Sequence, residues 1–471
     1  MSVNRETTAP KGIPAANQRC FPENFLWGAA TSSFQIEGSP LADGAGPSIW
    51  HRYTHTRGRI LDGSTADVAC DHYRRFREDV DLMSSLGLRA YRFSIAWGRI
   101  LPEGTGRVNT AGIDFYSRLV DSLLERSIVP FVTLFHWDLP AALDDRGGWL
   151  VPEIAGWFAD YGRILFRALG DRVQFWTTIN EPWVVVDAGY LHGVHAPGRM
   201  SSAEVPIAAH NLLRAHGACV EAFRSSCRQK IGLVVNLEPK YPASDSAADL
   251  AATERADIYM NRAFLDPVFT GRYPEGLANL FPNGWPEPSE SESRSISQPL
   301  DFLGINYYTR SVVRHDEATP VTRACAVIQE ASAYTETGWE VHPASLTRVL
   351  KWVRDRYGKI PLYVTENGAA LPDPDHLARD VVDDPIRIEF FRRHLLAAHR
   401  AIEDGVDLRG YFAWSLMDNF EWASGFTKRF GLVHVDYKTL RRTPKTSAWF
   451  YRDVIRSRGR ALYLPFPAEQ S

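Results

Sequence analysis

Short apolar runs rich in β-branched residues alternate along the chain with longer segments in which apolar residues recur every three or four positions. The short runs have the composition of buried strands, and the longer segments have the period of amphipathic helices. Strands that alternate with helices eight times predict a closed (β/α)8 TIM barrel rather than an open sheet. The predicted strands are residues 25–30, 90–97, 129–137, 175–180, 230–237, 302–308, 362–366 and 411–417, and the clearest helices are 71–87, 113–124, 346–357 and 385–404.

The chain has 471 residues, a length that α/β barrels with long loops reach as one unit. No Gly/Ser linker or shift in composition marks a second domain, so we predict one barrel domain over residues 21–465 with elaborated βα loops. Residues 1–20 are polar and lack the apolar core of a signal peptide, which predicts a flexible N-terminal tail. The Pro/Ser/Glu-rich stretch 282–297 predicts an exposed loop before the sixth strand.

Charge and cysteine content indicate which kinds of binding partner and which cellular compartment to expect. The 53 basic and 56 acidic residues are interspersed and give a net charge of −3, which does not favour a nucleic-acid partner. No apolar stretch is long enough to cross a membrane. The five cysteines are too scattered for a disulfide framework, which predicts a reducing, cytoplasmic location. Small neutral ligands fit this composition best. The composition does not decide whether the protein forms a homo-oligomer.

Two glutamates end apolar runs at the tips of predicted strands. Glu181 closes WTTINE (176–181), and Glu366 closes LYVTE (362–366). Barrel enzymes carry their active sites at these tips. Acetal hydrolysis needs one group to protonate the leaving oxygen and another to attack or stabilise the anomeric carbon. A pair of carboxyl groups does this with retention when they lie roughly 5–5.5 Å apart and with inversion at roughly 6.5–9.5 Å.

A buried, hydrogen-bonded strand terminus is the alternative interpretation for either acid taken alone. Two such acids, each beside an asparagine and among aromatic residues, favour the chemical interpretation. Both runs resemble the acid/base and nucleophile motifs of glycoside hydrolase family 1, the β-glucosidases. Further segments resemble this family in the same order along the chain: FPENFLWGAATSSFQIEG (21–38), YRFSIAW (91–97), LFHWDLP (134–140), GINYY (304–308) and WSLMDNFEW (414–422).

The resemblance implies roles for the two acids and for the residues that support them. Glu181 is expected to act as general acid and then as general base, and Glu366 as the nucleophile. Arg92 is expected to keep Glu366 ionised, although a structural ion pair inside the barrel is the alternative role. The resemblance also places Tyr308 beside Glu366, Asn306 near both acids, and Asn180 at the sugar 2-hydroxyl.

Recognition of the sugar is implied for a second set of residues. Side chains with two polar atoms suit vicinal hydroxyls, and aromatic faces suit the C–H faces of a pyranose. A carboxylate at Glu421 argues against 6-phosphosugars, which it would repel. Trp339 is expected on the aglycone side, with Trp183 and Ala188 at the entrance. The sugar-binding set is Gln35, His136, Trp137, Asn180, Asn306, Tyr308, Trp414, Glu421, Trp422 and Phe430.

The sequence thus predicts a retaining exo-β-glucosidase that acts on terminal β-D-glucosyl residues without a cofactor or a metal. Expected substrates are cellobiose and aryl or alkyl β-glucosides. A β-fucosidase, a β-galactosidase or a transglycosylase is the alternative within the enzyme class. A sugar-binding protein without activity is the alternative from another class, although both acids are present.

Three other signals are interpreted as structural. His51 with His55, and His394 with His399, share predicted helical spacing but belong to no HExxH motif, so we expect solvated or hydrogen-bonded histidines. The basic run RRTPK (441–445) is interpreted as a solvated face before the last helix.

Overall fold

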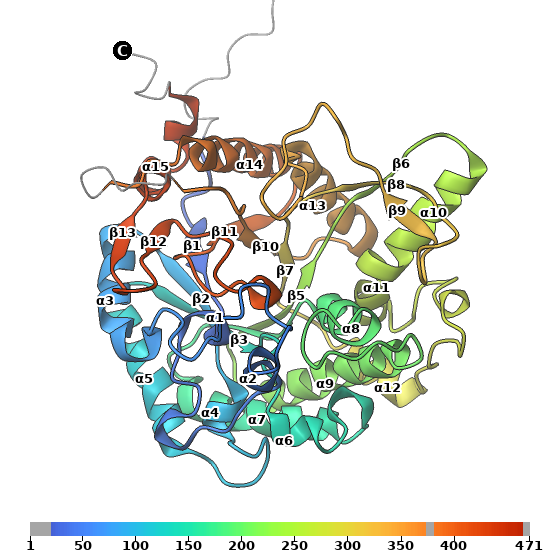
Figure 1. Ribbon diagram of the computed structural model, residues 1–471, viewed down its shortest axis with the longest axis horizontal. Helices are drawn as coiled ribbons and strands as arrows, with labels where there is room; N and C mark the ends of the chain where they lie inside the picture. Colours follow the sequence, from blue (N-terminus) through green and yellow to red (C-terminus); the bar gives the residue numbers. More distant parts are fainter. Residues whose placement is uncertain (1–19, 374–380, 465–471) are drawn as a thin grey trace, which may run out of the picture.

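The computed structural model describes residues 20–373 and 381–464, and its centre is a closed barrel of parallel strands (Figure 1). The order around the barrel is β1-β11-β10-β7-β5-β4-β3-β2, so β1 closes the sheet against β11. The predicted TIM barrel is confirmed. Its strands are β1 (Leu26–Ala30), β2 (Ala90–Ser94), β3 (Val129–Phe135), β4 (Phe175–Asn180), β5 (Lys230–Asn236), β7 (Phe302–Asn306), β10 (Leu362–Asn367) and β11 (Leu408–Trp414).

Helices surround the strands on all sides (Figure 1). The four helices expected from the apolar period are confirmed as α3, α5, α13 and α14. Among the described residues, no helix combines the length and apolar character needed to cross a bilayer. The longer helices are α3 (His72–Ser85), α5 (Thr110–Glu125), α7 (Ile154–Leu169), α9 (Val205–Ser226), α10 (Ala247–Asp257), α11 (Ala263–Thr270), α13 (Pro343–Tyr357), α14 (Pro385–Glu403) and α15 (Thr446–Arg456).

Aromatic rings fill the barrel at the starting ends of its strands. The Phe131 ring lies 5.1 Å from those of Phe175 and Phe412 and 5.2 Å from that of Phe302. Glycine makes room for them, because a Cβ at Gly28 would lie 2.5 Å from the Phe412 ring. This packed layer closes one end of the barrel, so a ligand can enter only from the other end.

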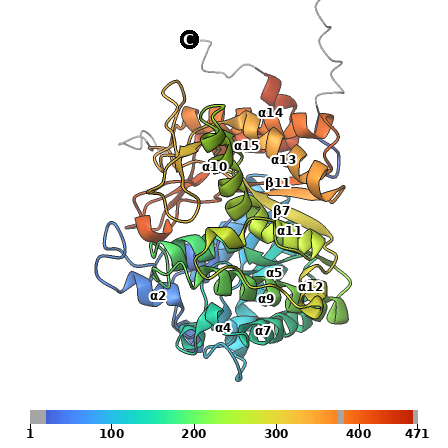
Figure 2. The same cartoon turned by 90° about the vertical axis from the view of Figure 1, so that its right-hand side faces the viewer.

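The connections at the open end carry short elements (Figures 1 and 2). A three-stranded sheet, β6-β8-β9, packs with α10, and the hairpin β12-β13 precedes α15. These elements lie in the connections after β5, β7 and β11, as expected for elaborated βα loops. Their bounds are β6 (Lys240–Pro242), β8 (Ser311–His315), β9 (Ala324–Ala326), β12 (Val433–Val435), β13 (Arg442–Pro444), α1 (Ser33–Ile36), α2 (Ile49–Thr54), α4 (Trp97–Ile100), α6 (Ala141–Asp144), α8 (Pro182–Val186) and α12 (Glu290–Ile296).

The boundaries of several strands differ from the prediction. The last strand is Leu408–Trp414 rather than 411–417, because Arg409 and Gly410 interrupt the apolar pattern where the strand begins. Gly410 is needed there, since a Cβ would lie 2.7 Å from the Tyr363 ring. The predicted strand 90–97 ends at Ser94, and α4 begins at Trp97.

The prediction of a loop over 282–297 is wrong for its second half, which forms α12. Ser289 and Glu292 form a capping box: the Glu292 backbone N–H donates to Ser289 Oγ (3.2 Å), and the Ser289 N–H donates to Glu292 Oε2 (2.9 Å). Ile296, the last residue of the helix, is buried. The polar composition concealed this helix, although the Ser-x-x-Glu pattern is a helix-start signal.

The interpretation of residues 441–445 as a solvated face is also wrong. The Lys445 ammonium is fully buried and contacts Asp373 (2.7 Å) and Asp418 (3.0 Å). Arg442 is nearly buried and pairs with Asp79 (2.8 Å). Each cation faces a buried carboxylate from a distant part of the chain, which a local charge pattern cannot reveal. The predicted N-terminal tail lies outside the described residues except for Cys20.

Candidate active site

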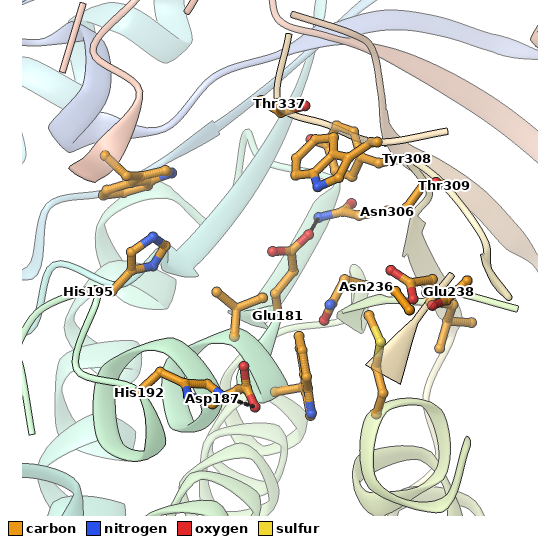
Figure 3. A pocket seen from close by; sticks show the side chains of 18 of the residues that line it. Glu181, Asp187, His192, His195, Asn236, Glu238, Asn306, Tyr308, Thr309 and Thr337 are labelled. Atoms are coloured by element: carbon orange, nitrogen blue, oxygen red, sulfur yellow. Dashed lines mark hydrogen bonds and ion pairs between the residues drawn. The ribbon is translucent and has the colours of Figure 1, made fainter. Parts of the chain in front are cut away.

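A cavity of about 740 Å³ lies at the carboxyl ends of the barrel strands, and both predicted glutamates line it. Figure 3 shows Glu181 among the lining side chains. Glu181 follows β4, and Glu366 lies near the end of β10. Asn306 ends β7, and Trp414 ends β11. Side chains that are distant in sequence meet in this cavity because the parallel strands all end on the same side.

Glu181 occupies an unusual backbone conformation between β4 and α8. Its φ of 48° is left-handed, and Pro182 begins the helix directly after it. Trp137 (φ 78°) and Trp422 (φ 46°) share this conformation, which residues other than glycine seldom adopt. All three side chains line the cavity. The fold therefore holds strained backbone at three points of the cavity wall, a pattern that is common at functional sites.

The Glu181 carboxyl is buried and accepts one strong hydrogen bond, from Asn306 Nδ2 to Oε1 (2.6 Å; Figure 3). Burial raises its pKa to about 8, and the neighbouring negative charge of Glu366 contributes in the same direction. No Lys or Arg forms an ion pair with it within residues 20–373 and 381–464. Glu181 therefore holds a proton at neutral pH and can donate it.

The Glu366 carboxyl is buried to a similar extent but has a cation beside it. Arg92 Nη1 contacts Oε1 (2.5 Å), and the Tyr308 hydroxyl donates to Oε2 (2.6 Å). Burial raises the pKa of Glu366, while the Arg92 charge and the Tyr308 hydrogen bond oppose that effect. Because the guanidinium lies against Glu366 and not against Glu181, we infer that Glu366 is the first of the two to ionise.

Two asparagines join the surroundings of the acids. Arg92 Nη2 donates to Asn180 Oδ1 (2.6 Å), and Asn306 Nδ2 donates to the same oxygen (3.1 Å). Asn180 Nδ2 faces His136 Nε2 at 3.1 Å. Burial, and then the Arg92 charge, hold the pKa of His136 well below its usual value, so the ring is neutral and its Nε2 accepts. This network fixes the orientation of the groups around both carboxyls.

One wall of the cavity is built from aromatic rings. The Trp137 and Trp422 ring centroids lie 4.5 Å apart, and the His136 ring is nearly parallel to that of Trp414 at 6.0 Å. On another side, Trp339 lies 4.9 Å from Tyr308 and 6.1 Å from Phe430. Such flat faces suit the C–H faces of a sugar ring.

Gln35 and Glu421 add polar groups beside the aromatic wall. Gln35 Nε2 donates to the Phe420 carbonyl (2.8 Å) and lies 3.3 Å from Glu421 Oε2, while Ser32 Oγ donates to Gln35 Oε1 (2.7 Å). Burial raises the pKa of Glu421 to about 8, and the charge of Glu366 adds to that effect. A buried carboxyl and amide side by side can hold a pair of neighbouring hydroxyls.

The predicted site residues come together, with differences in how directly they face the cavity. All of them line it except Gln35, Asn180 and Arg92, which lie behind lining residues and contact them. Trp183 lines the cavity, whereas Ala188, which was also expected at the entrance, does not.

Sequence reasoning missed several lining residues, among them His195, Asn236 and Glu238 (Figure 3). Asn236 ends β5 and pairs in register with Asn306, so a polar residue at the fifth strand tip was a usable signal. His195 lies in a connection and has no local pattern that marks it. Its ring lies 5.5 Å from that of Trp137, a contact that only the fold creates.

Among the described residues, two groups of histidine and acidic side chains lie close enough to share a cation, and both are outside the cavity. They are His51 with His55 and Asp67, and Asp373 with Asp418 and His434. Inside the cavity, Glu181 and Glu366 contact amide, phenol and guanidinium donors. One carboxyl that holds a proton and one that holds a charge can together protonate a leaving oxygen and attack an electrophilic carbon.

Comparison with known proteins shows the family of this chain. The sequence model of glycosyl hydrolase family 1 matches residues 17–460. Beta-glucosidase A of Thermotoga maritima is 48% identical, covering 94% of this chain and 99% of its own. A bifunctional beta-D-glucosidase/beta-D-fucosidase of Bifidobacterium breve is 44% identical, covering 92% and 98%. The T. maritima beta-glucosidase structure in complex with glucoimidazole has a TM-score of 0.91 at 48% identity, covering 94% of this chain and 100% of that chain. This chain therefore belongs to glycosyl hydrolase family 1.

Proposed function

We propose that this protein is a retaining exo-β-glucosidase that removes terminal β-D-glucosyl residues from O-glycosides and short oligosaccharides. The observation that carries the proposal is the contrast between two buried acids in one cavity. Glu366 contacts a guanidinium at 2.5 Å, and Glu181, which accepts from Asn306, has a pKa of about 8. Membership of glycosyl hydrolase family 1 supports the retaining course.

In the first step, Glu366 attacks the anomeric carbon, and the bond to the leaving oxygen breaks. Glu181 transfers its proton to that oxygen, so the aglycone departs as a neutral alcohol. A glycosyl ester on Glu366 results. Asn180, oriented by Arg92 at 2.6 Å, is placed to hydrogen-bond the sugar 2-hydroxyl as the ring flattens.

In the second step, water hydrolyses the ester. Esterification removes the negative charge of Glu366, which is one of the causes that raise the pKa of Glu181. The pKa of Glu181 then falls, and its carboxylate can take a proton from the attacking water. Two displacements at the same carbon return the β configuration. The proposed reaction uses only these side chains and water, so it requires no cofactor.

The proposed substrate is an unphosphorylated glucoside. Gln35 and Glu421 would bind neighbouring hydroxyls of the terminal sugar, and the aromatic wall would cover its ring. The cavity continues past Glu181 to Asn236 and Glu238, which leaves room for the aglycone. Cellobiose and aryl or alkyl β-glucosides are the expected substrates, which would suit a role in cellulose breakdown.

Replacement of the nucleophile tests the mechanism. Glu366→Gly should abolish hydrolysis of a nitrophenyl β-glucoside, and added azide should restore turnover with an α-glucosyl azide as product. Azide would enter from the face that Glu366 occupies, which explains the inverted product. A Glu366→Gly variant that hydrolyses the glucoside without azide would contradict the proposal, as would wild-type protein that binds glucosides but releases no glucose.

Activity on β-fucosides is a second candidate, favoured by the similarity to the bifunctional Bifidobacterium breve enzyme. A panel of nitrophenyl glycosides of glucose, galactose, fucose, mannose and 6-phosphoglucose separates the candidates. We expect glucoside and fucoside to be cleaved and the 6-phosphoglucoside to be refused, because Glu421 would face its phosphate. Preferred cleavage of the 6-phosphoglucoside would contradict the role given to Glu421.

We also propose a cytoplasmic location. All five cysteines lie in the described part of the chain and are free thiols, and Cys70 and Cys219 are buried. Unpaired cysteines are typical of a reducing compartment, which supports the proposal. Homo-oligomer formation stays a prediction.

A further inference from the structure

A compact group of potential metal ligands lies outside the active site, on α2 and on the segment before α3. His51 belongs to α2, His55 is the C-cap of that helix, and Asp67 follows in the next connection. Their ligand atoms all lie within 4.8 Å of one another. His55 Nε2 is 3.1 Å and His51 Nε2 is 3.9 Å from the Asp67 carboxylate. Two imidazoles and one carboxylate form a typical ligand set of open zinc sites.

Both ring nitrogens of His55 face hydrogen-bond acceptors. Its Nδ1 lies 2.7 Å from the His51 carbonyl, and its Nε2 lies 3.1 Å from the Asp67 carboxylate. Both of these groups only accept hydrogen bonds, whereas a neutral imidazole has one N–H to donate. A second proton or a metal ion at Nε2 resolves the conflict. A metal ion there would leave the Nδ1–H on the backbone carbonyl, which is how metal-bound histidines are usually oriented.

His51 provides a second nitrogen ligand. Its ring centroid lies 4.4 Å from that of His55. The side chains of His55 and Asp67 are 42% and 45% exposed, so an ion can enter from solvent and keep bound water. The nearby Arg52 guanidinium is paired with Asp145 (2.5 and 2.7 Å) and does not occupy the site.

The other group of this kind differs in its surroundings. Asp373 and Asp418 already contact the Lys445 ammonium, and Asp418 also contacts Arg429 (2.8 Å). These cations satisfy the carboxylates and would repel a metal ion. Within residues 20–373 and 381–464, by contrast, the ion pairs of Asp67 are those with the two histidines.

The elements that carry these ligands also support the sugar-binding wall. On α2, the Trp50 ring lies 4.6 Å from that of Trp422. The Asp67 carbonyl accepts from the Ser39 N–H (2.7 Å), close to the end of α1, which contains Gln35. An ion between α2 and Asp67 would thus join the helix that packs on Trp422 to a segment bonded near the end of α1.

We propose that His51, His55 and Asp67 bind one divalent transition-metal ion of the Zn²⁺ type, with water completing the coordination, and that this ion fastens α2 to the segment around Asp67. The ion takes no part in the proposed hydrolysis, because the site is separate from the cavity. Its expected effect is on stability, since an ion that binds only the folded state stabilises it.

Zinc binding to the full-length protein tests this proposal. After treatment with a chelator, calorimetric titration with ZnCl2 should give one site with micromolar affinity. Zinc at a hundredfold excess over Kd should raise the Tm by about 2–3 °C. Co²⁺ should give the visible d–d absorption of a site with low coordination number.

Three ligand variants and a matched control locate the ion. His51→Ala, His55→Ala and Asp67→Asn should each weaken zinc binding by at least about tenfold and remove the Tm increase. His315→Ala is the control, because His315 also contacts a carboxylate, that of Glu317 (3.1 Å), but belongs to neither group of potential metal ligands found among the described residues. It should bind zinc as the wild type does. Unchanged zinc affinity in the three variants, or no zinc binding below about millimolar concentration in the wild type, would overturn the proposal.

Discussion

Two glutamates of the same cavity differ in what their carboxyl groups contact. Glu366 lies between a guanidinium and a phenol, whereas Glu181 accepts from an amide. Both carboxyls are buried, so burial alone would raise the pKa values of both. The position of one cation, Arg92, therefore separates a residue suited to hold charge from a residue suited to hold a proton.

Removal of that cation should move the acid limb of the pH–rate profile. In Arg92→Met, Glu366 loses the charge that favours its ionised form, so its pKa rises. The low-pH limb of the kcat/KM profile should move to higher pH by about 1–3 pH units, so kcat/KM at acidic pH should fall. Arg442→Met is the control, because Arg442 pairs with the buried Asp79 away from the cavity. It should lower the Tm and leave the pH profile unchanged. An unshifted acid limb in Arg92→Met would refute the role of Arg92.

The basic limb should report Glu181. Its proton is needed in the first step, so kcat/KM should decline as pH rises through about 8. Glu181→Gln should lose this limb and slow the cleavage of alkyl glucosides by about 10²–10⁴-fold, with a smaller loss for activated aryl glucosides that need no protonation. Asp266→Asn, which removes a buried acid that pairs with Arg356, should keep the limb. The assignment fails if the basic limb persists in Glu181→Gln.

At the scale of elements, strands and their tips were predictable because each depends on a short local pattern. A buried parallel strand needs a continuous apolar run, and the residue that ends the run lies at the open end of the barrel. Glu181 and Glu366 were found in this way, whereas Asn306 was assigned by resemblance to the family motif. Asn180 and Arg92 were assigned by resemblance, since their pairing across the barrel depends on register.

Other features could not be predicted because their partners are far away in sequence. Lys445 belongs to a basic run, but its ammonium contacts Asp373 and Asp418. His51 and His55 share a helical spacing, but Asp67 completes the group. Helix α12 could have been found, since its capping box is a local signal that the polar composition outweighed.

The ion pair of Lys445 should position the connection that carries Glu421 and Trp422. Asp418, which begins this connection, accepts from Lys445 and from the Gly431 N–H (2.9 Å). Lys445→Met leaves Asp418 and Asp373 buried with one cation fewer, a change that typically costs about 3–5 kcal/mol. For a chain of this length the Tm should fall by about 3–5 °C. The KM for a nitrophenyl glucoside should also rise, because Glu421 loses its support.

Lys351→Met provides the matched control. Lys351 also pairs with an aspartate, Asp404 (2.8 Å), but its side chain is 39% exposed. Exposed pairs contribute little, so this variant should change the Tm by less than about 1 °C and leave KM unchanged. Equal effects of the two variants would contradict a supporting role for the buried cluster.

At the scale of the whole molecule, the acids of the cavity oppose stability at high pH. Burial, and then the charge of Glu366, raise the pKa values of Glu181 and Glu421 to about 8 in the folded state. Above the ordinary glutamate pKa, the unfolded chain releases protons that the folded protein keeps, so stability falls as pH rises towards 8. Buried histidines make the folded state less stable as pH falls. Burial lowers the pKa of His195 and His216 to about 4 in the folded protein. Below the ordinary histidine pKa the unfolded chain therefore binds protons that the folded protein does not, and the free energy of unfolding decreases.

Below about pH 6.5 the effects of the histidines and of the two cavity acids on stability cancel in part, and above pH 6.5 only the effect of the acids continues. The Tm should therefore decline between pH 6.5 and 8, because each acid lowers the free energy of unfolding by up to about 1.4 kcal/mol per pH unit. The double variant Glu181→Gln/Glu421→Gln should show a flatter profile and a higher Tm than the wild type at pH 8, when both are measured by calorimetry at constant ionic strength. Glu290→Gln, which changes an exposed side chain, should keep the wild-type slope. If the double variant declined as steeply as the wild type, the cavity acids would not limit stability. A flatter profile would mean that the buried acids needed for the proposed catalysis and sugar binding are held at the expense of the folded state, as expected where function and stability compete.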